Sequence, residues 1–97
     1  MLFALICTDK PDSLELRMNT RPEHVAYLSD LNDRGILKIA GPFLNESDEP
    51  CGSLVVVEAE NKDAARMIAE NDPYSLAGLF AEVDIRPYNW TFNNPGA

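Results

Sequence analysis

The sequence predicts an α+β domain in which two helices cover one face of a four-stranded antiparallel sheet. Three observations support this prediction. The length of 97 residues suits one domain. Two segments carry helix end signals, and four segments have the apolar patterns of strands. Because these segments alternate as strand, helix, strand, strand, helix, strand, the chain is expected to form a single domain over residues 1–97.

The four predicted strands differ in how apolar their two faces are. Residues 1–7 are apolar throughout and end at a Thr-Asp-Lys-Pro turn, so this strand is expected to be buried on both faces. Val55-Val56-Val57 forms the centre of the third strand. The last strand alternates, with Leu79, Ala81, Val83 and Ile85 on one face and Phe80, Glu82, Asp84 and Arg86 on the other. The predicted strands are residues 1–7, 36–40, 53–59 and 79–86.

Both helices are predicted from signals at their ends. Thr20-Arg-Pro-Glu23 matches a capping box and Gly35 matches a stop, so residues 12–18 are expected to form only a short turn before the helix. Asn61 caps the second helix, which ends at Asn71-Asp72-Pro73 because proline disfavours helical geometry at the preceding residue. Residues 45–52 are predicted as an acidic loop and residues 74–78 as a connector.

This element order is that of a ferredoxin-like domain, whose helices cover only one face of the sheet. The other face would expose the apolar side chains of the first and third strands to water, so a second copy of the chain is expected to cover it. The mixed charges of the last strand suit an interface with polar parts.

Charge and patterning exclude several classes of function. Lys and Arg number 8 against 16 Asp and Glu, a net charge of −8, so neither nucleic acid nor an anionic membrane is an expected partner. An RNA-recognition domain has the same element order, but the third strand here carries valine and alanine where stacking aromatics are needed. The first apolar run is far shorter than the roughly 20 residues of a membrane span and has no basic segment before it, so a cytoplasmic location is expected.

His24 is the only histidine and the first candidate for chemistry. It shares a helix face with Tyr27, Leu28 and Leu31, so a buried structural histidine is the simpler interpretation. Its imidazole would instead move protons near neutral pH if a carboxylate held its tautomer. Arg21, one turn earlier, would then lie beside it.

Three sources for that carboxylate stay open at this point. Asp72 is the first candidate, although an Asp-Pro dipeptide also serves simply to end a helix. Asp9, at the end of the first strand, is the second, and a residue of a second subunit is the third. Asp30 and Asp33 share the helix of His24 but point away from it. With a single histidine and no cysteine pair at ligand spacing, neither a metal nor a cofactor is expected.

Several short motifs occur in the order found in a known family. They are Thr8-Asp9-Lys-Pro-Asp-Ser-Leu-Glu, Arg21-Pro22-Glu23-His24, Gly35-Ile-Leu-Lys-Ile-Ala-Gly41-Pro42, Asp72-Pro73-Tyr74 and Arg86-Pro87-Tyr88. Together they resemble the YciI-like (YCII-related) proteins over essentially the whole chain. The resemblance implies a dimeric α+β barrel, in which two ferredoxin-like protomers pack sheet against sheet. It also implies that His24 and Asp72 form an acid/base pair, with Arg21 as a contact for an anionic group.

The leading hypothesis is a small cytoplasmic enzyme that transfers protons without a cofactor or a metal. Its chemistry would be of lyase, isomerase or dehydrochlorinase type, on a small polar or aromatic compound. His24 and Asp72 would be catalytic, and the substrate would be bound by Arg21, Asp9 and Tyr74. The alternatives are a ligand-binding or interaction module without catalysis and, with fewer supporting features, a cofactor-free monooxygenase. The loop at residues 43–52 would border the pocket. The polar tail at residues 91–97 would either be disordered or wrap a neighbouring subunit through Trp90 and Phe92.

Overall fold

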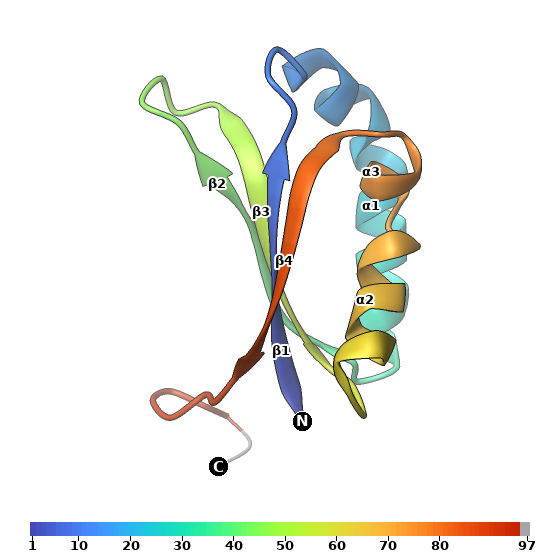
Figure 1. The fold of residues 1–97 in the computed structure, drawn as a ribbon, viewed down its shortest axis with the longest axis vertical. Coiled ribbons are helices and arrows are strands. Elements are labelled where there is room, and N and C mark those ends of the chain that lie inside the picture. The colour runs from blue at the N-terminus through green and yellow to red at the C-terminus, as the bar shows by residue number, and fades with distance from the viewer. Residues whose placement is uncertain (96–97) are drawn as a thin grey trace.

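The computed structural model describes residues 1–95, and in it helices cover one face of a single antiparallel sheet (Figure 1). The elements are β1 (Leu2–Asp9), α1 (Leu14–Asp33), β2 (Leu37–Leu44), β3 (Pro50–Glu58), α2 (Lys62–Glu70), α3 (Pro73–Leu76) and β4 (Phe80–Tyr88). The strand order is β2-β3-β1-β4, with every neighbouring pair antiparallel. The predicted ferredoxin-like α+β fold is therefore confirmed, with the short helix α3 in place of the expected connector.

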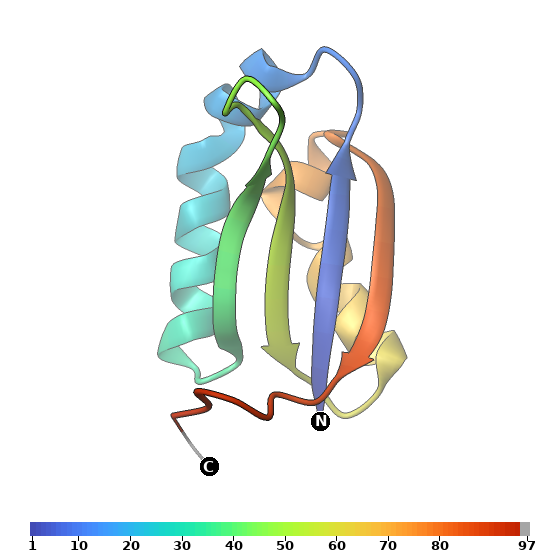
Figure 2. The same cartoon turned by 90° about the vertical axis from the view of Figure 1, so that its left-hand side faces the viewer.

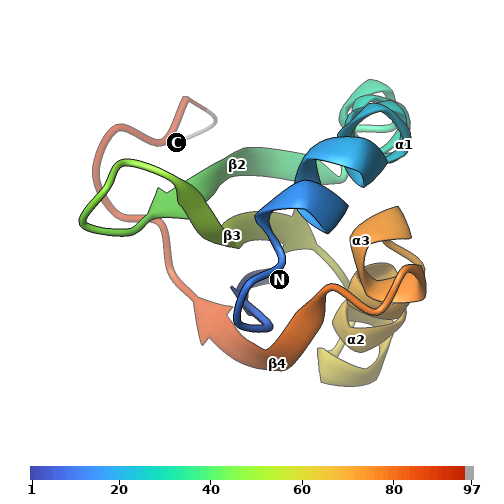
Figure 3. The same cartoon turned by 90° about the horizontal axis from the view of Figure 1, so that it is seen from above.

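The helices lie on the same side of the sheet but over different parts of it. Figure 2 looks onto the face that carries no helix, with β1 and β3 in the middle and β2 and β4 at the edges. Seen from above in Figure 3, α1 runs beside β2, while α2 and α3 lie on the β4 side. Within residues 1–95, no helix is long and apolar enough to cross a membrane.

The core lies between the sheet and α2. The register of β1 and β3 places Phe3 opposite Val57 and Leu5 opposite Val55, and all four side chains are buried. The small side chains of α2, Ala65 and Ala69, allow this helix to approach the sheet closely. The buried cluster consists of Phe3, Leu5, Cys7, Val55, Val57, Ala65, Ala69 and Ile85. Each fully buried valine or leucine contributes about 1.5–3 kcal/mol, so this cluster is a large source of the apolar stabilisation of the fold.

The first helix is longer than the sequence predicted. It begins at Leu14 and continues through Pro22 to Asp33, so the expected start at Thr20 is wrong. Pro22 removes one backbone N–H from the helix, which is normally destabilising. The turns before it are nevertheless helical, because Arg17 is held there by side chains of the sheet. His24 consequently lies in the middle of a long helix and not in its first turn.

The strands also differ from the prediction. β2 continues to Leu44 and β3 already begins at Pro50. The turn that connects them is therefore shorter than the expected loop at residues 45–52. The pairing of β4 with β1 is irregular at one point: Thr8 pairs with Glu82, but the next residue, Asp9, pairs with Phe80 and not with Ala81. This irregularity brings Phe80 to the helix-covered face, whereas simple alternation placed it with Glu82 on the other face.

Candidate active site

His24 and Asp72 are in direct contact. Nδ1 of His24 lies 2.8 Å and 3.0 Å from the two carboxylate oxygens of Asp72. The His24 side chain, from α1, is 10% exposed and that of Asp72 is 8% exposed. A carboxylate can only accept a hydrogen bond, so Nδ1 donates and the neutral imidazole keeps Nε2 as its proton acceptor. The pair can therefore take up a proton at Nε2, with the resulting imidazolium beside a negative charge.

The position of Asp72 follows from its place at the start of α3. It is the N-cap of this helix, and its Oδ1 accepts a hydrogen bond of 2.9 Å from the backbone N–H of Tyr74. Pro73 occupies the first helical position, where a missing N–H costs nothing. The Asp-Pro dipeptide thus begins one helix and also presents a carboxylate to His24.

Tyr74 fixes the orientation of the imidazole. The two rings are stacked, with centroids 3.9 Å apart and planes inclined by 16°. The tyrosine is only 1% exposed, and its ring also meets that of Phe80 edge-on at 6.0 Å. Burial raises the pKa of Tyr74, although the neighbouring Arg17 and Arg21 act in the opposite direction. Tyr74 is therefore a neutral phenol near pH 7.

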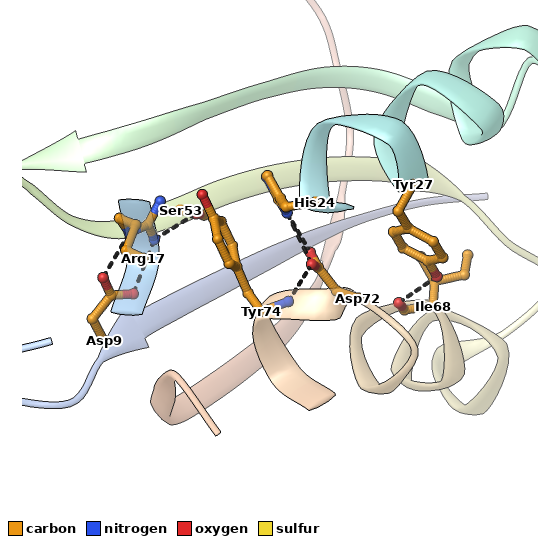
Figure 4. A network of polar contacts seen from close by, with 8 residues as sticks. All are labelled: Asp9, Arg17, His24, Tyr27, Ser53, Ile68, Asp72 and Tyr74. Atoms are coloured by element: carbon orange, nitrogen blue, oxygen red, sulfur yellow. Dashed lines mark hydrogen bonds and ion pairs between the residues drawn. The ribbon is translucent and has the colours of Figure 1, made fainter. Parts of the chain in front are cut away.

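Asp9 does not pair with His24 but with Arg17. Nε and Nη2 of Arg17 donate to the two carboxylate oxygens of Asp9 at 2.7 Å and 2.9 Å. Nη2 also donates to Oγ of Ser53 at 2.9 Å, and the guanidinium lies 4.6 Å from the centre of the Tyr74 ring. Figure 4 shows the resulting row of side chains, which runs from Asp9 through Arg17, Tyr74 and His24 to Asp72.

Arg17 is the site residue that the sequence analysis missed. The side chain is 4% exposed, and a buried charge is stable only when it is paired, as it is here with Asp9. The sequence did contain a signal for it. Arg17, Arg21 and His24 are spaced at i, i+4 and i+7, which places them on one face of a helix once that helix starts early enough. Two of the three buried residues of α1 are polar, which is unusual for a packing face.

A cavity of about 530 Å³ opens between α1 and the strands β2 and β3, and His24 and Tyr74 line it. The charged residues that line it are Arg17, Arg21 and Lys38, and none of the described lining residues is acidic, although the chain carries a net charge of −8. Arg21 lies at the exposed side of this cavity. The remaining walls are largely apolar. A cavity of this size fits a small organic molecule, and its charges favour an anionic one.

Comparison with known proteins identifies the family. Residues 1–89 match the YCII-related domain family. The chain belongs to this family. It is 40% identical to Protein YciI of Escherichia coli O6:H1 over 98 residues, which cover 95% of this chain and 100% of the relative. The recognition predicted from the ordered motifs is therefore confirmed.

Solved structures agree with the family assignment. The 5-chloro-2-hydroxyhydroquinone dehydrochlorinase of Burkholderia phenoliruptrix AC1100, in complex with 2,5-dihydroxybenzoquinone, is 32% identical, with a TM-score of 0.83 over 97% of this chain and 99% of the other. A NIPSNAP family protein of Agrobacterium tumefaciens C58 has a TM-score of 0.56 at 15% identity, over 97% of this chain and 95% of that one. The second likeness concerns the fold alone, whereas the first is to an enzyme that binds a small ring compound.

The YCII motifs are unevenly distributed around the cavity. Arg21 and His24 belong to one motif, Gly41-Pro42 to a second and Tyr74 to a third, and all of these residues line the cavity. The last motif, Arg86-Pro87-Tyr88, ends β4 and is not among the lining residues. In the part of the chain that the structure describes, no three His, Cys, Asp or Glu side chains are grouped so that they could hold a metal ion.

Proposed function

We propose that this YCII-related protein is an enzyme that works without a cofactor and transfers protons in a small polar or aromatic substrate. The observation that carries the proposal is the contact between Nδ1 of His24 and the carboxylate of Asp72 beside a cavity with basic residues. The likeness to a dehydrochlorinase supports a reaction of lyase, isomerase or dehydrochlorinase type. The two cysteines are free thiols, which supports a location in the reducing cytoplasm.

In this mechanism, Nε2 of His24 removes a proton from the substrate, and Asp72 stabilises the imidazolium that forms. An isomerase then returns the proton to another atom of the substrate. In an elimination, the proton stays with the base while the leaving group departs with its bonding electrons. General base catalysis of this kind accounts for about 10²–10⁴ of a rate enhancement.

The other predicted site residues have supporting roles. Arg21, at the exposed side of the cavity, attracts the anionic substrate. Tyr74 holds the imidazole by stacking on it. Both carboxylate oxygens of Asp9 bind Arg17, so Asp9 acts through that residue and does not touch the substrate.

The test compares the wild-type protein with His24→Gln, which preserves side-chain size but cannot act as a base. Product release is measured over a panel of chlorinated hydroquinones that includes 5-chloro-2-hydroxyhydroquinone. Turnover should fall about 10²–10⁴-fold in His24→Gln. The matched control is Glu23→Gln, an exposed neighbour on the same helix that should retain wild-type turnover. Equal turnover in His24→Gln, with only its stability reduced, would favour a binding module over an enzyme.

We also propose that a second copy of the chain covers the sheet face without helices, so that two protomers form a dimeric α+β barrel. Two large side chains support this proposal, because Ile39 is 39% exposed and Phe43 is 43% exposed. Ile39 pairs with Val56 and Phe43 with Gly52, so by the alternation of the strands both lie on the face opposite to that of the buried Val55 and Val57. Light scattering after size exclusion should give twice the chain mass of 10.8 kDa. A mass equal to one chain at micromolar concentration would contradict the proposal.

A further inference from the structure

Arg17 has hydrogen-bonding capacity that its partners in the fold do not use. A guanidinium carries five N–H groups in one plane. The three hydrogen bonds of Arg17 to Asp9 and Ser53 come from Nε and Nη2, and the Tyr74 hydroxyl is a further polar partner of the guanidinium. A single hydroxyl leaves at least one of the two N–H groups of Nη1 outside this set. Ser53 accepts from Arg17 and keeps its own O–H as a further donor. Both residues line the cavity, so these donors lie at its wall.

This guanidinium is held in place before any ligand arrives. The two hydrogen bonds to Asp9 fix its plane, and the ring of Tyr74 lies against it at 4.6 Å. Arg21, in contrast, is exposed and would have to be ordered on binding. A group that is already fixed binds a ligand with a smaller loss of conformational entropy. Arg17 is therefore better suited than Arg21 to bind one particular oxygen of a ligand.

Arg17 and His24 also lie close to each other, because both contact the Tyr74 ring. Figure 4 shows them on opposite sides of the Tyr74 ring. Their separation cannot exceed the sum of 4.6 Å, from the guanidinium carbon to the tyrosine ring centre, and 3.9 Å, from that centre to the imidazole centre. A six-membered ring with oxygens on opposite carbons spans a comparable length. One such ring can therefore reach the cation and the base together.

We propose that Arg17 and Ser53 bind an oxyanion of a planar ring, such as a phenolate, an enolate or a hydroxyquinone anion, while the opposite end of the ring meets Nε2 of His24. This inference rests on the proposed function, because it assigns the substrate class of the same cavity. The ring lies against the apolar side chains of the cavity wall, which include Leu28, Leu37 and Val55. Arg17 rather than Arg21 then determines which compounds bind.

Calorimetric titration with two ring compounds tests this assignment. The probes are 2,5-dihydroxybenzoquinone, which ionises, and 2,5-dimethoxybenzoquinone, which has the same ring but no ionisable oxygen. The wild-type protein should bind the ionised compound more tightly. Arg17→Met should lower that affinity at least about tenfold and remove the preference, because charge-assisted hydrogen bonds are lost. The matched control Arg66→Met removes an exposed cation of α2 that does not line the cavity and should change the affinity by less than about threefold, since exposed charges are screened by water and salt.

Removal of Arg17 alone leaves the buried carboxylate of Asp9 unpaired and can unfold the protein. The double variant Asp9→Asn/Arg17→Met removes both charges and gives the same readout in a folded chain, which circular dichroism verifies. The inference is overturned if variants without Arg17 keep the preference, if Arg66→Met loses it equally, or if the wild-type protein shows none. Turnover of the His24→Gln variant tells whether the anion site or the proposed function has failed. Normal turnover in His24→Gln refutes the acid/base role, whereas an Arg17-dependent preference would still establish the anion site.

Discussion

Replacing Asp72 with asparagine should remove the charge beside His24 and shift its tautomer, while the helix cap is retained. Oδ1 of Asp72 accepts from the backbone N–H of Tyr74 at 2.9 Å, and an asparagine oxygen can do the same. The asparagine amide nitrogen then takes the place of Oδ2, which lies 3.0 Å from Nδ1 of His24. This nitrogen can only donate, so it competes with Oδ1, which lies 2.8 Å from Nδ1 and remains an acceptor. The variant should therefore raise the share of the neutral imidazole that carries its proton on Nε2.

The expected loss of activity is much larger than the expected loss of stability. A neutral amide no longer stabilises the imidazolium and no longer holds the proton on Nδ1 alone, so turnover should fall about 10²–10⁴-fold. This factor corresponds to about 3–5 kcal/mol in the activation free energy. The fold exchanges one charge-assisted hydrogen bond for a neutral one, which costs about 1–2 kcal/mol. The Asp72→Asn variant should therefore be folded but nearly inactive.

Nitrogen-15 NMR of the imidazole measures the tautomer directly, without any knowledge of the substrate. His24 is the only histidine, so its signals need no assignment. The neutral form should carry its proton on Nδ1 in the wild-type protein, and the share with the proton on Nε2 should rise in Asp72→Asn. Glu70→Gln, which neutralises a nearby exposed carboxylate, serves as the control and should keep the wild-type tautomer. An unchanged tautomer in Asp72→Asn, or wild-type turnover, would refute the reasoning.

Three further predictions concern the fold. A Cβ at Gly52 would lie 2.5 Å from the carbonyl oxygen of Cys7, so Gly52→Ala should lower the free energy of unfolding, measured in urea, by about 1–3 kcal/mol. At Gly41 a Cβ would meet nothing within 4 Å, so an equal loss in Gly41→Ala would contradict this prediction. Burial raises the pKa of the Cys7 thiol from 9.0 to about 12, so iodoacetamide at pH 8 should alkylate Cys51 alone in the native protein. Equal labelling of the two cysteines, detected by mass spectrometry, would disprove this prediction. Burial also raises the pKa of Tyr74. A group with a raised pKa in the folded protein loses its proton more easily in the unfolded chain, so the folded state loses stability once the pH exceeds the unfolded pKa. The free energy of unfolding should consequently fall as the pH rises from about 9 to 12, and a flat profile would be inconsistent with these shifts.

Local patterns predicted the elements well where the pattern and the packing agree. The apolar run at residues 1–7 and the three valines at 55–57 became the buried centres of β1 and β3. The helix cap at Asn61 is present, with its side chain accepting from the N–H of Ala64. The start of α1 was wrong because the capping box at Thr20 is a local signal, whereas contacts of Arg17 with the sheet hold the earlier turns helical.

The sequence by itself determined the order of the main elements and the family, and it singled out His24 with Asp72 and Asp9 among the candidates for its carboxylate partner. Hydrogen bonding within helices and alternation along strands act over a few residues, so both can be read from neighbouring positions. Only the tertiary structure decided that Asp72 rather than Asp9 contacts His24, and that Asp9 instead pairs with Arg17. These pairings join segments far apart in the chain. They depend on the register of the strands and on where each helix lies over the sheet, which no local pattern contains.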